Sequence, residues 1–432
     1  MAVGRQCVDG ANRTFLIIGG GLAGAKAAQT LREENFTGRV ILVGDEHEHP
    51  YERPPLSKDY LLGRAERGSV YVHEPAWYAH HRIELHLGQP AVSIDRAARE
   101  VRLGDGARLP YDALLLATGA EPRRLGIPGT DLAGVHHLRR LAHADHLRGV
   151  LTGGVGPDRD GDPLVIAGAG WIGLEVAAAA RTLGVPVTVV EPAPGPLHHV
   201  LGPEAGEVFT ALHREHGVTF HFGTRLRAIH GRDGMVAEVL TEDGRRLPAR
   251  AVLAAIGAKP RTSLAAAAGL ELAGEGDGIA VDASLRTSDP RIFAAGDAAA
   301  VALPGAPGHR RVEHWANALN SGPAAARAML GQKVTYDRVP YFFSDQYDAG
   351  LEYSGWAPPG TYDRVVWRGS PQDVAKREFI AFWLAGGRVL AGLNMNVWDV
   401  TGPIQALIRS GRPVDEKALA DPEVPLASLA GD

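Results

Sequence analysis

The sequence predicts an α/β protein with two similar domains, the second inserted into the first, followed by a C-terminal α+β domain. Three observations support this prediction: a βαβ pattern that occurs twice, a hairpin pattern that also occurs twice, and an aromatic-rich C-terminal part. A chain of 432 residues with 45% hydrophobic content and 54 glycines suits several well-cored domains with many tight turns.

The βαβ pattern combines a strand, a glycine-rich loop, a helix and a second strand that ends in an acid. "TFLII" (14–18) runs directly into "GGGLAG", a helical stretch follows, and "RVILVGDE" (39–46) completes the unit. The same order returns in "PLVIAGAGWIG" (163–173), a second helical stretch and "VPVTVVEP" (185–192). Repetition of the whole order predicts two Rossmann-like domains.

The hairpin pattern follows each βαβ unit. "DGARLPYDALLLATGAEPR" (105–123) and "DGRRLPARAVLAAIGAKPR" (243–261) share an Asp-Gly turn, an apolar strand, Gly-Ala and Pro-Arg. Asp-Gly between apolar segments is typical of a hairpin. A further apolar strand, "RIFAAGD" (291–297), comes only after the second unit ends, which indicates that the second domain is inserted into the first.

The C-terminal part differs from both repeats. "VPYFFSDQYDAGLEYSGWA" (339–357) is rich in aromatic residues, "EFIAFWLAGGRVLAGLNMN" (378–396) predicts two strands joined by a Gly-Gly turn, and a helix is expected to end at Gly411. We expect a flexible N-terminal tail (1–13), a first domain made of two segments (14–123 and 251–333), a second domain (124–250) and a third domain (334–432).

Composition narrows the functional classes. The net charge is −5 and basic residues form no long run, which disfavours a nucleic-acid partner. No apolar stretch reaches the roughly 18 residues of a membrane span, and the N-terminus has no apolar signal region. The only cysteine, Cys7, excludes disulfides within the chain, so we expect a cytoplasmic location.

The first glycine loop, Gly19-x-Gly21-x-x-Gly24, is followed by Asp45 at the end of the second strand. Glycines at these positions allow a tight turn, close approach of a pyrophosphate and packing of helix on strand, and the acid can bind a ribose hydroxyl. The strand of 291–297 would carry Asp297 to the same sheet edge, where ligands bind.

The second loop, Gly168-x-Gly170-x-x-Gly173, is followed by Glu191. No arginine comes directly after Glu191, and a carboxylate there repels a 2′-phosphate, so NAD is favoured over NADP. The alternative is that Glu191 only ends a strand at the surface.

A family resemblance rests on five segments: "IIGGGLAGAKAA", "PYERPPLSKDYL", "LLLATGAEPR", "GAGWIGLEVA" and "TSDPRIFAAGD". They resemble the FAD-dependent pyridine nucleotide-disulphide oxidoreductases. "RPPLSK" and "VEHWANALNSG" are similar to the ferredoxin reductase branch, which includes putidaredoxin and rubredoxin reductases, with the apoptosis-inducing-factor family more distant. The resemblance implies FAD in the first domain, NADH in the second, and a C-terminal domain that closes over the flavin.

The resemblance also implies site residues. Those expected to contact FAD are Asp45, Lys58, Val92, Arg139, Asp297 and Trp315. Those expected around NAD are Gly168, Gly170, Gly173, Glu175 and Glu191. Further candidates for cofactor binding from the same motifs are Arg53, Thr118, Gly119, Trp171, Ile172 and Gly257. Two departures are the missing arginine after Glu191 and the variant tail "NMNVWDVTGPIQALIRSG".

Relatives of this fold that reduce disulfides pass electrons to a cysteine pair, and this sequence has none. The reduced flavin must therefore pass its electrons to an acceptor outside this protein. Since a flavin accepts a hydride and can release single electrons, a one-electron carrier such as an iron–sulfur protein is the natural partner.

Lys58 and Glu175 are the catalytic candidates. Pro54 and Pro55 favour a helix start, which would place Lys58 about one turn into a helix near its positive end. A cation there loses roughly 0.3–1 kcal/mol unless an anion compensates it. The resemblance suggests a Lys–Glu pair near the flavin's reactive edge, where Lys58 would stabilise negative charge on reduced flavin and Glu175 would hold Lys58 and position the nicotinamide. The alternative is a solvated lysine and an ordinary acid at a helix N-terminus.

The remaining candidates leave alternatives open. Trp171 could gate the nicotinamide or only pack, and Trp315 could lie on the flavin or in the core. No metal site is expected, because His47 and His49 have no partner cluster. Arg310 and Arg311 could join Arg53 or Arg338 in a basic patch for an acidic ferredoxin, or these arginines could form a scattered solvated face.

Three functions fit the sequence. The first is an NADH-dependent ferredoxin reductase that supplies a cytochrome P450 or a ring-hydroxylating dioxygenase. The second is an NADH oxidase or quinone reductase with a small-molecule acceptor. The third is a flavoprotein that changes conformation or partner with NADH, as the apoptosis-inducing-factor relatives do.

Overall fold

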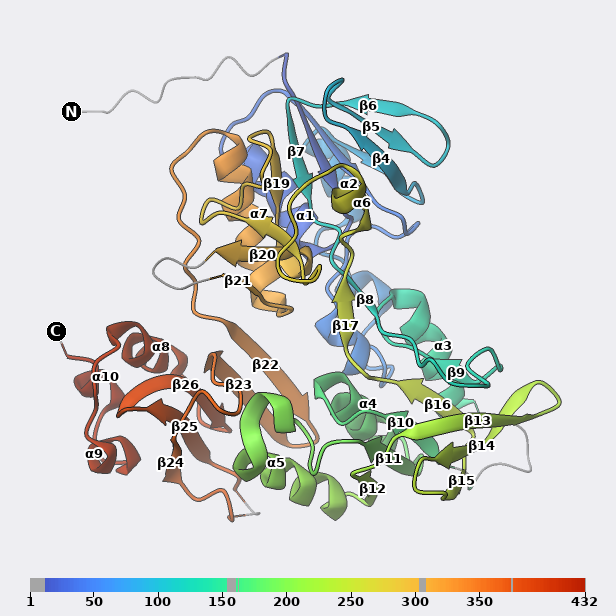
Figure 1. Ribbon diagram of the computed structural model, residues 1–432, viewed down its shortest axis with the longest axis vertical. Helices are drawn as coiled ribbons and strands as arrows, with labels where there is room; N and C mark the ends of the chain where they lie inside the picture. The colour runs from blue at the N-terminus through green and yellow to red at the C-terminus, as the bar shows by residue number, and fades with distance from the viewer. Residues whose placement is uncertain (1–11, 154–160, 162, 303–307, 374–375, 432) are drawn as a thin grey trace. The chain divides into compact units, whose positions relative to one another are not determined.

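The chain forms two compact units, seen in a computed structural model that describes residues 12–153, 161, 163–302, 308–373 and 376–431 (Figure 1). Cys7 and most of the predicted N-terminal tail lie outside these ranges. The first unit comprises Met1–Glu52, Arg67–Glu121 and Lys259–Arg338. The second comprises Arg53–Glu66, Pro122–Ala258 and Val339–Asp432.

The first unit is built on a parallel sheet in the order β19-β7-β1-β2-β3. Its strands are β1 (Thr14–Ile18), β2 (Arg39–Val43), β3 (Ile83–His86), β7 (Ala113–Leu116) and β19 (Ile292–Ala294). Because β19 pairs with β7, the chain returns to this sheet after the whole second repeat, so the predicted insertion is confirmed.

Small residues let two helices approach each other beside this sheet. Helix α1 (Leu22–Glu33) is the predicted crossover helix and packs against α7 (Trp315–Met329). A side chain on Gly322 would lie 2.2 Å from the carbonyl oxygen of Ala23, so only glycine permits this approach.

Shorter elements complete the first unit. The predicted Asp-Gly hairpin forms between β5 and β6, with Gly106 at φ +91° in its turn. The other elements are η2 (Arg67–Val70), α2 (Pro75–His80), β4 (Ala91–Asp95), β5 (Glu100–Leu103), β6 (Arg108–Pro110), α6 (Ser263–Ala267), β18 (Ile279–Val281), η3 (Gly296–Ala298), β20 (Ala299–Ala302) and β21 (His309–Arg311). Strands β8 (Ala120–Pro122) and β17 (Ala258–Pro260) each contain a boundary between the units.

The second unit contains the second repeat, a parallel sheet in the order β12-β11-β10-β16-β9. Its strands are β9 (Val135–His136), β10 (Leu164–Ala167), β11 (Val187–Glu191), β12 (Val218–Phe222) and β16 (Ala251–Ala254). The helices of this unit that precede its C-terminal region are η1 (Pro54–Ser57), α3 (Leu141–Thr152), α4 (Trp171–Thr182) and α5 (His198–Glu215). The second predicted hairpin is part of an antiparallel sheet of β13 (Leu226–Arg232), β14 (Met235–Thr241) and β15 (Arg246–Pro248).

The C-terminal region of the second unit is an antiparallel sheet in the order β22-β23-β26-β25-β24. Its strands are β22 (Tyr341–Gln346), β23 (Ala349–Gly355), β24 (Arg364–Gly369), β25 (Phe379–Ala385) and β26 (Arg388–Met395). The predicted Gly386-Gly387 turn joins β25 to β26 with φ of +55° and +74°, a conformation that suits glycine. The fold class predicted from the sequence is therefore confirmed.

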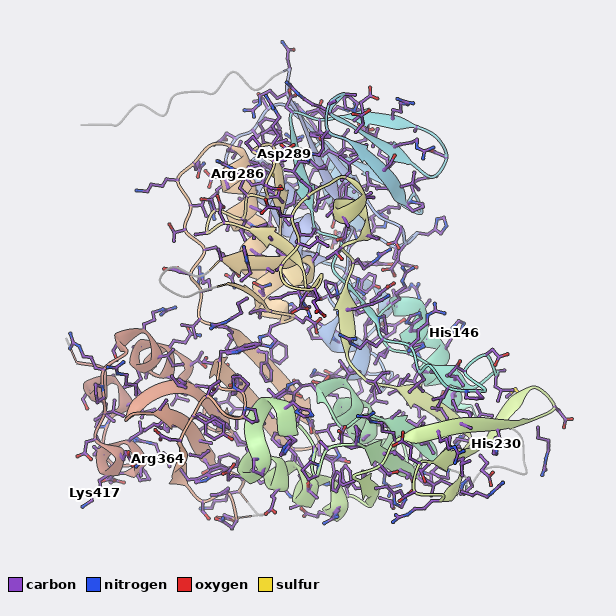
Figure 2. The ribbon with its side chains drawn as sticks, viewed as in Figure 1. His146, His230, Arg286, Asp289, Arg364 and Lys417 are labelled. Atoms are coloured by element: carbon purple, nitrogen blue, oxygen red, sulfur yellow. The ribbon has the colours of Figure 1, made fainter. Side chains whose placement is uncertain are left out.

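Three helices follow this sheet, α8 (Thr401–Ser410), α9 (Glu416–Ala420) and α10 (Leu426–Leu429). Their apolar residues, among them Ile404 and Leu419, form one core with Ile380 and Phe382 of the sheet. Figure 2 labels Arg364 on β24 and Lys417 on α9, and Arg364 Nη1 lies 3.0 Å from Glu416 Oε1. Within the described ranges, every helix is too short or too polar to cross a lipid bilayer.

Candidate functional site

The glycine loop of the first unit joins β1 to α1 and has no room for side chains at two of the three glycines of its Gly-x-Gly-x-x-Gly motif. Gly19 has φ +129°, and a Cβ there would lie 2.0 Å from the carbonyl oxygen of Ala117. A Cβ on Gly24 would lie 2.1 Å from the carbonyl oxygen of Gly19. A Cβ on Gly21 would meet nothing within 4 Å. The middle glycine thus faces open space, where a diphosphate can approach the backbone.

The glycine loop of the second unit repeats this geometry between β10 and α4. Gly168 has φ +102°, and its Cβ would lie 2.5 Å from the carbonyl oxygen of Ala255. A Cβ on Gly173 would lie 2.3 Å from the carbonyl oxygen of Gly168, and one on Gly170 would meet nothing. Both loops therefore fit a dinucleotide. The backbone packs closely around the first and third glycines of each motif, and the middle glycine leaves space for the diphosphate.

Other predicted residues of the first unit follow the carboxyl ends of the same parallel strands. Asp45 follows β2, and its Oδ2 accepts a hydrogen bond of 3.0 Å from Arg261. Thr118 follows β7 and donates to the carbonyl oxygen of Arg261 over 2.7 Å. Asp297 follows β19 in η3 and is 8% exposed. The carboxyl edge of a parallel sheet is where ligands bind, so these side chains and the glycine loop form one candidate FAD site.

Glu191 ends β11, and its carboxylate is fixed beside the second glycine loop. Oε2 accepts from the backbone N–H of Ala169 over 2.7 Å, and Oε1 accepts from that of Ala193 over 2.8 Å. Two backbone donors hold the negative charge at the position where an adenosine ribose is expected. The role of Glu191 toward a ribose stays a prediction beside the alternative that it only ends a strand at the surface.

Lys58 does not lie near the positive end of a helix. Residues Pro54–Ser57 form a single 3₁₀ turn, η1, and Lys58 follows its last residue with φ −123° and ψ −119°. The expectation that a helix dipole opposes Lys58 is therefore wrong, because two consecutive prolines close one tight turn here and no α-helix continues from it. The need for an anion comes instead from burial, since only 13% of the Lys58 side chain is exposed.

Glu175 supplies that anion. Its Oε1 lies 2.8 Å from the Nζ of Lys58, and 5% of its side chain is exposed. Ser344 Oγ donates to the same oxygen over 2.6 Å, and Ser57 Oγ donates to Oε2. The Lys58 ammonium group also lies 5.5 Å from the centre of the Phe343 ring. The predicted pair thus exists in the structure, and its carboxylate is held by three donors.

The register of α4 against β22 explains this arrangement. Trp171 and Glu175 are four residues apart on α4 and share a helix face, while Phe342 and Ser344 are two apart on β22 and share a strand face. The rings of Trp171 and Phe342 meet with centres 4.6 Å apart, beside the contact of Glu175 with Ser344. Packing of Trp171 is observed, while its role as a nicotinamide gate stays a prediction.

Sequence reasoning missed Ser57 and Ser344. The signal for Ser344 is the alternation in "YFFSDQ", which buries Phe342, Ser344 and Gln346 on one face of β22. Burial raises the pKa of the neighbouring carboxyl, Asp345, on the opposite face, although Lys58 acts against this shift.

The other predicted cofactor residues have these surroundings. Trp315 begins α7 and donates from Nε1 to Glu52 Oε2 over 3.1 Å, and Arg53 donates to the carbonyl oxygen of Arg139. Val92 on β4 is 45% exposed, and Ile172 on α4 is 42% exposed. Gly119 and Gly257 follow β7 and β16 with φ of +67° and +89°. Their contacts with cofactors stay predictions.

Arg311 is not available for a basic patch. Its Nε lies 2.8 Å from Asp277 Oδ1, its guanidinium also pairs with Glu313, and 12% of its side chain is exposed. Because local acids neutralise this cation, Arg311 adds little to a patch for an acidic ferredoxin, and the alternatives for the other arginines stay open. Among the described side chains, no group of three or more His, Cys, Asp or Glu residues is arranged to hold a metal ion.

Two dinucleotide loops, each with an acid at or just past the end of its second strand, define an oxidoreductase of the class that binds both a flavin and a pyridine nucleotide. Comparison with known families gives the same result. A family described as pyridine nucleotide-disulphide oxidoreductase matches residues 13–322, and one described as reductase C-terminal matches residues 341–430. The chain belongs to the pyridine nucleotide-disulphide oxidoreductase family, and FAD and NAD(H) are the cofactors that this membership implies.

Individual relatives match nearly the whole chain. The anthranilate 1,2-dioxygenase system ferredoxin--NAD(+) reductase component of Burkholderia cepacia is 40% identical over 416 residues, which cover 96% of this chain and 98% of that protein. Putidaredoxin reductase CamA of Pseudomonas putida is 37% identical over 424 residues, 97% of each chain. The crystal structure of the covalent putidaredoxin reductase–putidaredoxin complex has a TM-score of 0.90 and 36% identity, over 98% of this chain and 100% of that chain.

Proposed function

We propose that this protein is an NADH-dependent ferredoxin reductase. It takes a hydride from NADH and delivers single electrons to a [2Fe-2S] or similar ferredoxin that serves a cytochrome P450 or a ring-hydroxylating dioxygenase. The observation that supports this function best is the match, along nearly the whole chain and including the C-terminal region, to proteins named as ferredoxin reductases. A sequence with one cysteine has no internal dithiol for the electrons, which favours an external acceptor.

The two glycine loops divide the binding of the diphosphates in this proposal. The loop of Gly19 to Gly24 binds the diphosphate of FAD, and Asp45 and Asp297 accept hydrogen bonds from its polyol and ribose. The loop of Gly168 to Gly173 binds the diphosphate of NADH, and Glu191 accepts from the adenosine ribose and repels a 2′-phosphate. The remaining proposed FAD contacts are Lys58, Val92, Arg139 and Trp315.

FAD, when bound, supplies the change from two-electron to one-electron chemistry. Lys58 provides a fixed positive charge in a place with little water, where an electrostatic interaction is stronger than in solvent. Glu175 keeps that ammonium group in position through a 2.8 Å contact and is itself held by Ser57 and Ser344. The proposed roles are that Lys58 stabilises negative charge on the reduced cofactor and Glu175 positions Lys58 and the nicotinamide.

The domain division of the proposal keeps the boundaries predicted from the sequence: FAD domain 14–123 and 251–333, NAD domain 124–250, C-terminal domain 334–432. A cytoplasmic location is part of the same proposal and is supported by the single cysteine of the sequence. Fractionation of the native host with antibody detection would test it.

Stopped-flow spectroscopy tests the function. The FAD-loaded protein is first mixed with NADH and then, after reduction, with a panel of [2Fe-2S] ferredoxins, oxygen or quinones. We expect fast reduction by NADH and fast reoxidation by at least one ferredoxin. Fast reduction followed by reoxidation with oxygen or quinones only would contradict the proposal and indicate an oxidase or quinone reductase.

A further inference from the structure

The carboxylate of Glu175 is one end of a row of buried polar groups that the proposed chemistry does not use directly. Ser344 and Gln346 lie on the buried face of β22 and are 0% and 1% exposed. His213 of α5 is also 0% exposed. The row connects α4, which carries the NAD loop, with α5 through a single strand of the C-terminal sheet.

The contacts in this row are continuous. Ser344 Oγ lies 2.6 Å from Glu175 Oε1, and Gln346 Nε2 lies 3.1 Å from Ser344 Oγ. Gln346 Oε1 lies 2.9 Å from His213 Nε2, and the hydroxyl of Tyr347 lies 3.3 Å from His213 Nδ1. Every group except Tyr347 is buried, so each of these polar atoms depends on its neighbour for a hydrogen-bond partner.

The chemistry of the groups determines the direction of each hydrogen bond. A carboxylate that pairs with Lys58 can only accept, so Ser344 must donate its single hydroxyl proton to Glu175. Ser344 can then only accept from Gln346, and the amide nitrogen of Gln346 must face it. The amide oxygen of Gln346 therefore faces His213, so His213 must carry its proton on Nε2.

Neutral histidine then leaves Nδ1 free to accept from Tyr347. All four bonds thus donate in one direction, from Tyr347 through His213, Gln346 and Ser344 to Glu175. Burial, which lowers the pKa of His213 to about 4, agrees with a neutral ring at neutral pH. Aligned hydrogen bonds polarise one another, so the last donor binds its acceptor more strongly than an isolated serine would.

We propose that Ser344, Gln346 and His213 are positioning residues, a directional hydrogen-bond chain that fixes the Glu175 carboxylate and, through it, the Lys58 ammonium group. The inference rests on the proposed function, since it assigns these residues to hydride transfer from NADH. It also explains why polar residues occupy the buried face of β22, where apolar ones would avoid the cost of desolvation.

A spectroscopic test needs no turnover. Long-range ¹H–¹⁵N correlation spectra of the FAD-loaded protein, labelled with ¹⁵N-histidine, report which ring nitrogen carries the proton. The His213 signals are assigned by their loss in His213→Gln. We expect the neutral Nε2–H form. A ring protonated on Nδ1 alone, or on both nitrogens at neutral pH, would overturn the directional chain.

A kinetic test separates positioning from mere packing. We expect Ser344→Ala to slow flavin reduction by NADH about three- to tenfold, because Glu175 loses a charge-assisted hydrogen bond. The apparent Kd for NADH should change less than twofold, and Ser344→Thr, which keeps a hydroxyl, should restore most of the rate. The matched control is Ser354→Ala, which removes a hydroxyl that is 2% exposed in β23 of the same sheet and should leave the rate unchanged.

The outcomes distinguish this inference from the proposed function. The positioning role would be overturned if Ser344→Ala were reduced by NADH as fast as wild type, or if Ser344→Ala and Ser344→Thr lost the same fraction of this rate. Neither result would bear on whether the wild-type protein reduces a ferredoxin. If NADH reduced the wild-type protein but no ferredoxin reoxidised it, the proposed function would be overturned. The rate of flavin reduction by NADH would still test the hydrogen-bond chain.

Discussion

The ammonium group of Lys58 lies 2.8 Å from the carboxylate of Glu175, and the two side chains are 13% and 5% exposed. Sequence reasoning assigns these residues to different domains, yet one compact unit of the structure contains both. A charge pair with so little water is costly to break, because either partner alone would remain as an uncompensated charge in a poor solvent for ions. The pair can therefore be tested by stability as well as by rate.

Lys58→Met leaves the Glu175 carboxylate buried with two hydroxyl donors and no cation. We expect it to lower the free energy of unfolding by about 3 kcal/mol, at the lower end of the range for a broken buried pair. Lys58→Met combined with Glu175→Gln removes both charges and should recover at least half of the loss. Urea denaturation measures both, and a single variant as stable as wild type would show that the pair is solvated.

The same substitution should also slow flavin reduction. We expect Lys58→Met and Glu175→Ala each to lower the reduction rate constant with NADH about tenfold or more, because the fixed positive charge is lost or misplaced. Stopped-flow absorbance gives the rate. Lys259→Met is the matched control, since Lys259 pairs with Glu121 over 2.9 Å but is 57% exposed. Unchanged rates in both site variants would rule out the electrostatic role.

Much of the fold could be predicted from the sequence because its signals are local and repeated. Two glycine loops, two Asp-Gly hairpins and the strand of β19 are contiguous motifs, and the structure places them as expected. The helix expected at Lys58 was wrong, because the length of a proline-initiated turn depends on what packs against it. The alternation of β22 indicates that Ser344 is buried, but its contact with Glu175 depends on the register of β22 against α4, which no local pattern encodes.

Substitution of single glycines should separate folding from FAD binding. The Cβ of Gly21→Ala meets no protein atom within 4 Å, whereas that of Gly24→Ala would lie 2.1 Å from the carbonyl oxygen of Gly19. We expect Gly21→Ala to keep the melting temperature of the FAD-free protein but to lose FAD on purification. Gly24→Ala should lower that melting temperature as well, because helix and loop must move apart. Equal FAD content in Gly21→Ala and wild type would argue against a diphosphate at this loop.

Glu191 should determine the choice of coenzyme. Glu191→Ala removes the carboxylate that is held by the N–H groups of Ala169 and Ala193. We expect the ratio of kcat/KM for NADPH to that for NADH to rise at least about tenfold. Without the carboxylate, the 2′-phosphate of NADPH is no longer repelled, and the 2′-hydroxyl of NADH loses its hydrogen-bond acceptor. Steady-state reduction of ferricyanide with each coenzyme measures the ratio. Glu207→Ala on α5, a change of the same charge outside the loop, should leave the ratio unaltered.

The stability of the protein should fall in acid, in part because of His213. Burial lowers the pKa of His213 to about 4, with a smaller contribution from His216, whereas an unfolded histidine titrates near 6.5. As the pH falls from 6.5 to 4, the unfolded chain binds this proton first, so the free energy of unfolding decreases through this window by at most about 3 kcal/mol for this residue. Denaturant midpoints at a series of pH values should therefore depend less steeply on pH in His213→Gln than in wild type.

His230, labelled in Figure 2, lies beside Glu238 with 43% of its side chain exposed, so His230→Gln serves as the control for the loss of a histidine outside the buried row. A His213→Gln variant with the full wild-type slope would mean that His213 is already protonated in the folded protein near pH 6. In that case its Nδ1 could not accept from Tyr347, and the hydrogen-bond chain to Glu175 would begin at a cation instead of a neutral ring.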